Sequence, residues 1–242
     1  LTSTNFTGRL AVVQPDYLCL FGRRSISTLD PRTGDVLWRR DGLPQYSSVV
    51  GTSGVVFIVP QDHTKTQAFR ALDGKPLKID GLGTLISNAM LTRGDSLLVL
   101  EQGPSLKLLG IGGAKAIVRL FNPVTKNEQW KVELPTGSLV AALNDDELLA
   151  VPLDGKAERI EIATGRRSPL ESLPSNAMQG RRGETFAMVD DERIYLLVNT
   201  LDNSGVHHYG ESLLSVRAHG TIYAWNRADG KLAWKQDVKH QN

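Results

Sequence analysis

Residues 28–38 read TLDPRTGDVLW, and this stretch decides the fold. Asp30 lies four positions before Gly34, and Trp38 lies four positions after it. A glycine supplies the positive φ that a tight turn requires, and an aspartate placed here can accept hydrogen bonds from backbone amides inside the turn. The stretch therefore predicts a tight turn that leads into a strand bearing a large aromatic side chain.

The same frame returns along the chain, centred on positions 74, 126, 165 and 230. Two of these copies keep a tryptophan, and two weaker ones keep only the glycine: Asn122 with Lys126 and Trp130, Asn226 with Gly230 and Trp234, Gly74 with Lys78, and Gly165 with Pro169. Together with the first copy they give five repeats, with a basic period of about 40 residues and two insertions. Such a period is typical of a β-propeller, in which each repeat forms one four-stranded blade.

Short apolar and β-branched runs, such as 55–59 and 194–198, fill the space between the turns. They are separated by Gly, Asp and Asn, which is the pattern of hairpins, and no segment shows the long apolar periodicity of an amphipathic helix. We therefore predict an all-β fold, a β-propeller or an arc of one with five four-stranded antiparallel blades, as a single domain over residues 1–242. Because the chain starts without Met or a signal segment, we expect a piece of a longer protein.

Composition limits the function classes. The 242 residues carry a formal net charge of +2, which gives no electrostatic footprint for nucleic acid, and no apolar run reaches the roughly 18 residues of a membrane-spanning helix. We predict no nucleic-acid partner and no direct membrane insertion. The one cysteine, Cys19, lies in an apolar stretch and is expected to be a buried free thiol.

Two long insertions, near 101–115 and 199–220, interrupt the regular repeat and are candidate binding loops. The second contains His207, His208 and Tyr209, which we predict to be a ligand or partner loop. Adjacent histidines on a strand point to opposite faces, which disfavours a shared metal. The acidic hairpin tips at 145–147 and 190–192 could bind Ca²⁺, although hydrated turn residues are commoner. No set of residues has the pattern of a catalytic, cofactor or metal site, so we predict none and no cofactor.

The repeated turn resembles the tryptophan-docking motif of the quinoprotein (PQQ-like) β-propeller repeat, written AxDxxTGxxxW. The resemblance covers most of the chain and assigns a structural docking role to ten residues: Asp30, Gly34, Trp38, Gly74, Asn122, Trp130, Gly165, Asn226, Gly230 and Trp234. A docked tryptophan lies across the neighbouring blade, where it buries roughly 150–250 Å². Lys78 and Pro169 stand where tryptophan is expected, so we expect those two blades to dock less tightly.

The resemblance implies the BamB-like, non-enzymatic branch of the family, and a bacterial protein that is periplasmic or secreted. We predict a non-catalytic scaffold that binds a protein or extended ligand through its loops. Two alternatives stay open: a fragment of a PQQ- and Ca²⁺-dependent dehydrogenase, or the sensor domain of a larger signalling protein. The dehydrogenase would need a tryptophan to stack on the cofactor, and Trp225 is the only one outside the docking positions. A single cysteine excludes the vicinal pair that such enzymes often carry.

Overall fold

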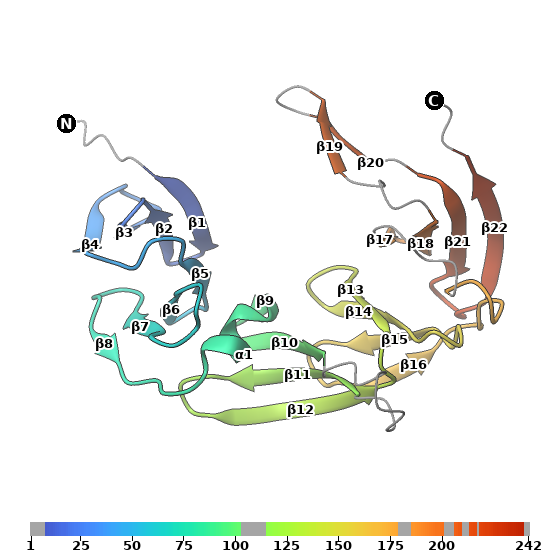
Figure 1. Cartoon of the computed structure of the whole chain (residues 1–242), viewed down its shortest axis with the longest axis horizontal. Helices are drawn as coiled ribbons and strands as arrows, with labels where there is room; N and C mark the ends of the chain where they lie inside the picture. The colour runs from blue at the N-terminus through green and yellow to red at the C-terminus, as the bar shows by residue number, and fades with distance from the viewer. Residues whose placement is uncertain are drawn as a thin grey trace. The chain divides into compact units, whose positions relative to one another are not determined.

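The computed structural model describes residues 8–102, 115–178, 185–200, 206–209, 213–216 and 218–239, with only the backbone of 206–209 and 213–216. Within these residues the chain forms five four-stranded antiparallel sheets, which are the blades, and one two-stranded sheet (Figure 1). This confirms the prediction of an all-β propeller fold built from five repeats. In the described ranges the helical structure is one short helix, α1 (Gly83–Ser87).

The first three blades follow one another in sequence, and in each the strands pair in chain order. Blade 1 is β1 (Arg9–Gln14), β2 (Tyr17–Phe21), β3 (Ser25–Leu29) and β4 (Val36–Asp41); blade 2 is β5 (Ser48–Gly51), β6 (Val55–Val59), β7 (Gln67–Arg70) and β8 (Pro76–Leu77); blade 3 is β9 (Ala89–Arg93), β10 (Ser96–Gln102), β11 (Ala116–Asn122) and β12 (Asn127–Leu134).

The last two blades have the same strand order, and blade 5 adds an inserted hairpin. Blade 4 is β13 (Leu139–Ala142), β14 (Glu147–Val151), β15 (Glu158–Glu161) and β16 (Arg167–Pro169); blade 5 is β17 (Thr185–Val189), β18 (Arg193–Asn199), β21 (Gly220–Asn226) and β22 (Leu232–Val238). Between the second and third strands of blade 5 the chain inserts the hairpin of β19 (Val206–Tyr209) and β20 (Leu213–Val216).

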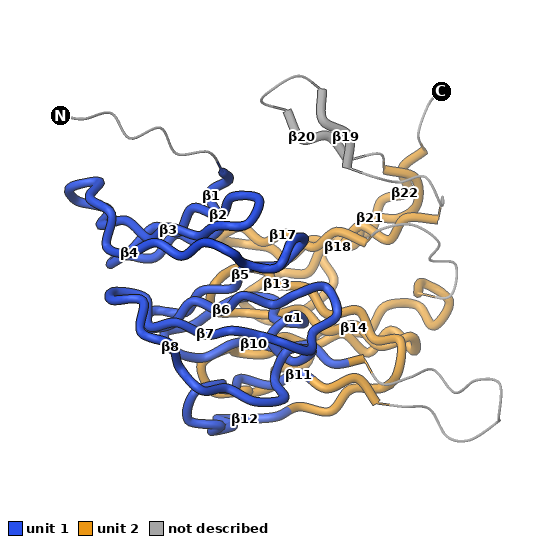
Figure 2. Tube along the Cα trace, turned by 60° about the vertical axis from the view of Figure 1, so that its left-hand side comes forward, with its two compact units in different colours: residues 1–101, 118–131 blue, residues 102–117, 132–242 orange. Residues whose placement is uncertain are grey.

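The chain divides into two compact units, which Figure 2 shows in two colours. Unit 1 comprises residues 1–101 and 118–131 and holds blades 1 and 2 with most of blade 3. Unit 2 comprises residues 102–117 and 132–242 and holds blades 4 and 5. A single propeller domain over 1–242 stays a prediction.

The repeated turns have the backbone that the sequence pattern predicts. Gly34, Gly74, Gly165 and Gly230 have φ between 66° and 76°. In each, the glycine N–H donates to the carbonyl oxygen four residues earlier, as from Gly34 to Asp30 at 2.8 Å. Lys126 occupies the same place in the third copy and also takes a positive φ, 57°, which is unfavourable for a residue with a Cβ atom.

The core lies between blades, because successive side chains of a strand point to opposite faces of the sheet. In the fully buried strand β6, Val56 and Ile58 pack toward blade 1, with Tyr17 and Cys19. Val55, Phe57 and Val59 of the same strand pack toward blade 3, with Leu97 and Val99. One strand thus contributes to both of its interfaces, which explains its unbroken apolar sequence.

Cys19 is a free, fully buried cysteine, as the sequence predicts. Its burial disfavours the thiolate and raises the pKa of the thiol to about 12. The neighbouring Tyr17 is also fully buried, and its hydroxyl donates to the backbone oxygen of Thr52 at 2.7 Å. This hydrogen bond joins the second strand of blade 1 to the first hairpin of blade 2.

Candidate functional site: docking turns and hairpin tips

The first docking turn can be followed atom by atom. The indole Nε1 of Trp38 donates to the backbone oxygen of Ala71 at 2.7 Å. A Cβ atom added at Gly74 would lie 2.7 Å from Cδ2 of Trp38, so the indole lies directly on the glycine of the next blade's turn. Arg40 donates to the Gly74 oxygen at 3.0 Å, and its guanidinium lies 4.7 Å from the ring centroid of Phe69. A methyl group at position 74 would therefore clash with the indole of Trp38.

Polar side chains fix the turns themselves. Asp30 accepts a hydrogen bond from the amide of Arg32 at 2.8 Å. Asn122 accepts from the amides of Val124 and Thr125 at 2.9 and 3.0 Å. Trp130 and Trp234 lie on β12 and β22, the outermost strands of their blades. The ring of Trp234 lies 6.0 Å from that of Tyr195 on the same sheet and is 39% exposed.

Blade 4 has no docking tryptophan, and a different contact stands in its place. The amide of Glu171 donates to the Gly230 oxygen at 2.8 Å, and the indole Nε1 of Trp225 donates to the Glu171 oxygen at 2.8 Å. Leu170 is buried in the core that contains Trp225. Its backbone and the Pro169 oxygen would meet a Cβ added at Gly230. The segment after β16 therefore covers the next turn with backbone and aliphatic groups.

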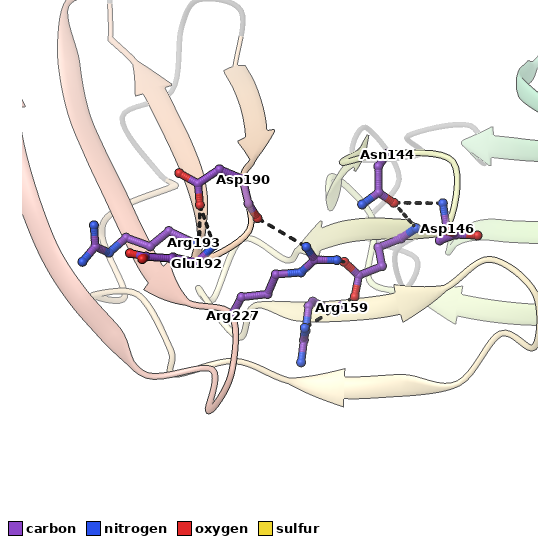
Figure 3. Close-up of polar contacts among 8 residues, drawn as sticks. Asn144, Asp146, Arg159, Asp190, Glu192, Arg193 and Arg227 are labelled. Atoms are coloured by element: carbon purple, nitrogen blue, oxygen red, sulfur yellow. Dashed lines mark hydrogen bonds and ion pairs between the residues drawn. The ribbon is translucent and has the colours of Figure 1, made fainter.

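A cluster of charged side chains lies at the hairpin tips of blades 4 and 5 (Figure 3). In the tip between β13 and β14, Asn144 Oδ1 accepts hydrogen bonds from the amides of Asp146 and Glu147, both at 2.8 Å. An Asn side chain that bonds the backbone two and three residues on closes the turn locally. The tip is therefore held in one shape by its own sequence.

The tip between β17 and β18 is closed in the same way. Asp190 Oδ1 accepts from the amides of Glu192 and Arg193 at 2.8 and 2.6 Å, and Oδ2 accepts from the hydroxyl of Tyr195 at 2.8 Å. The hydroxyl and then the two amides stabilise the carboxylate, so the pKa of Asp190 is lowered from its usual value. The same hydrogen bond raises the pKa of Tyr195.

Arg227 ties the two tips together. Its Nη2 donates to Glu147 Oε2 at 2.7 Å, its Nη1 to the Asp190 backbone oxygen at 3.3 Å, and its own amide donates to the Glu192 oxygen at 2.8 Å (Figure 3). The other oxygen of Glu147 accepts from Arg159 at 3.4 Å. Glu147 is thus shared by two arginines, and a residue from the fifth docking turn joins two hairpins.

The tips present acidic side chains to solvent around this tie: Asp145, Asp146, Asp190, Asp191 and Glu192 are all exposed. In the part of the chain that the structure describes, no three His, Cys, Asp or Glu side chains come together in a group that could hold a metal ion. The Ca²⁺ reading of the tips therefore gains no support from their geometry. The two tips form an exposed acidic surface whose turns are closed by the hydrogen bonds described above.

The sequence pattern indicates the acidic tips, but it does not predict that Arg227 links them. Arg227 follows Asn226 in the fifth turn and looks like any solvated turn residue, so nothing in its local sequence indicates a partner in another hairpin. Two other arginines of blade 4 form pairs within their own sheet, and Arg167 pairs with Glu158 at 2.7 Å. Arg166 likewise pairs with Glu161 at 3.2 Å.

The predicted partner loop is described only in part. The backbone of His207, His208 and Tyr209 lies in β19, where these residues pair with Ser215, Leu214 and Leu213 of β20. Their side chains lie outside the described residues. The prediction that this loop binds a ligand or partner therefore stays a prediction. Within the described segments, no helix is long and apolar enough to span a bilayer.

The blades and their repeated turns define a β-propeller of the PQQ-like class. A family model described as "Outer membrane protein assembly factor BamB" matches residues 114–242, which is more than half of the chain. The chain belongs to this family, and the resemblance inferred from the sequence is confirmed. A search of the curated proteins gave no match.

Solved structures similar to this chain include several propellers. BamB from Moraxella catarrhalis is 14% identical with a TM-score of 0.37, and the match covers 94% of this chain and 62% of that one. AztD from Citrobacter koseri is 15% identical with a TM-score of 0.45, covering 97% and 73%. The N-terminal domain of Nup159 is 8% identical with a TM-score of 0.49, covering 96% and 61%. The chain thus spans less than two thirds of the length of the BamB structure.

Proposed function

We propose that this protein is a non-catalytic propeller scaffold that binds a protein partner through its loops. The observation that carries the proposal is the surface formed by the tips at 144–147 and 190–192. Arg227 fixes the two tips to each other, and local hydrogen bonds fix each one internally. A surface that is ordered before binding loses little conformational entropy when the partner arrives.

The chemistry of this surface indicates the kind of partner. Five exposed acidic side chains surround a cluster in which both arginines already share Glu147. Electrostatic complementarity steers encounters and excludes partners of like charge, so the partner segment should be basic. The description of the family as an outer-membrane protein assembly factor supports a protein ligand and a periplasmic or secreted location.

The dehydrogenase alternative has weaker support. It needs a tryptophan with a free face, but Trp225 is fully buried and its indole N–H is donated to the Glu171 oxygen. The sensor-domain alternative depends on sequence context that the blades do not carry. Neither alternative is favoured by a contact in the described residues.

Photo-crosslinking in the producing cell would test the proposal. A photoreactive residue replacing Asp191 should give one discrete adduct with a protein, whereas the same residue at Lys65, exposed in the loop between β6 and β7, should not. Charge reversal by Asp145→Lys should weaken the adduct at position 191. Equal adducts from both positions, or no effect of Asp145→Lys, would contradict binding at the tips.

A second measurement addresses catalysis. PQQ and Ca²⁺ would be titrated into the folded protein while the melting temperature and the absorbance of the cofactor are followed. Any ligand that binds the native state must raise the apparent stability by mass action. We expect no shift, and a saturable increase would overturn the non-catalytic proposal.

A further inference from the structure

A pocket of about 570 Å³ lies on blade 1, where the turn between β2 and β3 faces the connection from β4 to β5. Arg9, Phe21, Arg23, Gln45 and Tyr46 line it, and we call it the blade-1 pocket. Its volume falls in the range of roughly 300–1,000 Å³ that small-ligand sites occupy. All of its walls belong to unit 1.

Hydrogen bonds hold the two walls together. The amide of Leu43 donates to the Arg24 oxygen at 3.0 Å, and Arg24 Nε donates back to the Leu43 oxygen at 3.4 Å. The side chain of Leu43 is buried in the core between blades 1 and 2. Ser47 Oγ donates to the Pro44 oxygen at 2.9 Å, which closes the connection on the other side of Gln45 and Tyr46. The pocket is therefore formed before any ligand binds.

Tyr46 is the unusual residue of this pocket. It has a φ of 58°, in the left-handed region that disfavours residues with a bulky side chain, and it is 80% exposed. Glycine would adopt this backbone without strain and would lose no core packing. Strained residues of this kind are concentrated at binding sites. The strain therefore makes the exposed phenol ring a candidate contact for a ligand.

The charge of the pocket is positive. Arg9 and Arg23 are both exposed, and neither forms an ion pair within the described part of the chain. The acidic residue of the adjoining depression, Asp41, is already bound by Arg39, which donates to it at 2.9 and 3.2 Å. Two guanidinium groups therefore remain to attract an anion beside an aromatic ring.

We propose that the blade-1 pocket binds an acidic, extended segment of a protein, with a carboxylate held by Arg9 and Arg23 and an apolar side chain against Tyr46. The planar guanidinium group matches the two oxygens of a carboxylate. Tyrosine and arginine are also the residues that most often dominate the energy of protein contacts. The inference rests on the proposed function in that the ligand is part of a protein, but it names a different surface and the opposite ligand charge.

The test uses the full chain and a fluorescent peptide of alternating glutamate and phenylalanine, followed by anisotropy. A peptide with lysine in place of glutamate serves as the opposite-charge probe. We expect Arg23→Glu to weaken binding of the acidic peptide at least tenfold. The matched control is Arg32→Glu, an equal charge change at an 80% exposed side chain in the turn after β3, which should change affinity less than twofold.

Tyr46→Gly separates binding from folding. It removes the ring and relieves the backbone strain, so it should weaken the peptide about tenfold while the melting temperature stays equal or rises. Unchanged binding in Tyr46→Gly, or equal loss in Arg32→Glu and Arg23→Glu, would overturn the proposal. If inorganic phosphate competes fully and Tyr46→Gly has no effect, the pocket is a simple anion site and the peptide assignment is wrong.

The two proposals fail independently. Loss of the Asp191 crosslink with intact peptide binding would overturn the proposed function of the tips and leave the blade-1 pocket standing. An absent peptide interaction with an intact crosslink would do the reverse.

Discussion

Two interfaces of this protein perform the same task with different side chains. Between blades 1 and 2, Trp38 lies on Gly74 and donates to Ala71. Between blades 4 and 5, Leu170 and the backbone of Glu171 lie on Gly230, and Trp225 reaches back from the other blade. In both interfaces, the end of one blade packs on the glycine turn of the next blade, and an indole N–H donates a hydrogen bond to a backbone oxygen across the interface. At the first interface the indole belongs to the earlier blade, whereas at the second it belongs to the later blade and points back.

The blades with and without the docking tryptophan also differ in the length of their outermost strand. Blades 1, 3 and 5, which carry the tryptophan, have outermost strands of 6, 8 and 7 residues. In blades 2 and 4, which lack it, these strands have only 2 and 3 residues. After blade 2 the chain instead packs Ile79, which precedes α1, and Ile86 of α1 into the core with blade 3. Aliphatic side chains thus pack where the tryptophan is missing, and the weaker docking of this interface stays a prediction.

The largest loss of stability should come from removing Trp225, the indole that points back toward blade 4. Trp225→Ala removes a fully buried side chain and leaves the Glu171 oxygen without its donor, which should lower the free energy of unfolding by about 3–5 kcal/mol. Trp234→Ala in the same blade, where the side chain is 39% exposed, should cost less than half as much. Urea denaturation would measure both, and equal losses would mean that Trp225 is not the anchor of this interface.

The glycine turns give a graded series. Gly74→Ala adds both left-handed strain and a clash with Trp38, so it should cost about 2–4 kcal/mol. Gly34→Ala has the same strain at φ 76° but meets no atom within 4 Å, so it should cost about 1–2 kcal/mol. Urea denaturation of the two variants gives the comparison. If they lost equal stability, Trp38 would not be docked on Gly74 in solution.

The first interface should also weaken in alkali. Burial raises the pKa of the Cys19 thiol above its unfolded value, to about 12, so the folded state retains a proton that the unfolded state loses. The stability is complete below pH of about 8.5, the unfolded pKa, and falls as pH rises toward 12. The slope should reach about 1.4 kcal/mol per pH unit.

The variant Cys19→Ala isolates this contribution. Its free energy of unfolding should fall less steeply between pH 9 and 10 than that of the unsubstituted protein, whatever its absolute stability. Tyr17 also adds to the slope in both proteins, because burial and then the neighbouring Cys19 raise its pKa, so the difference in slope reports Cys19 together with its effect on Tyr17. Identical slopes would show that the thiol ionises as readily in the folded state as in the unfolded one.

A smaller effect tests the hydrogen bond alone. Trp38→Phe keeps an aromatic ring over Gly74 but removes the N–H that bonds Ala71. Loss of one such hydrogen bond should cost about 1 kcal/mol. Chemical denaturation against Trp38→Ala, which should lose more, would separate the ring from the N–H; equal losses would assign the docking energy to the hydrogen bond.

The smallest change should be a gain. Lys126→Gly removes the strain of a positive φ in the third turn and should raise the free energy of unfolding by about 0.5–1 kcal/mol. Val124→Gly, in the same turn and 42% exposed, has no such strain to relieve and should not stabilise. Thermal unfolding of both variants checks the sign.

The sequence by itself determined the blades and their turns. Positive φ is strongly disfavoured for residues with a Cβ atom, so a glycine recurring with Asp or Asn before it marks a turn whatever surrounds it. Alternation along each strand likewise depends only on neighbouring residues. These local rules were enough to identify Gly34, Gly74, Gly165 and Gly230, and to expect Cys19 in the core.

Only the tertiary structure decided which distant groups meet. Arg227 bonds Glu147, and Trp225 bonds Glu171, across 80 and 54 positions of the chain. No local sequence pattern predicts such pairs, because the turn or strand that holds each partner would form whether or not the other partner were present. The blade-1 pocket is of the same kind, since Arg9, Arg23 and Tyr46 come from three separate segments. The two binding surfaces that we propose depend on such long-range contacts, whereas the fold depends on a short turn motif that recurs along the chain.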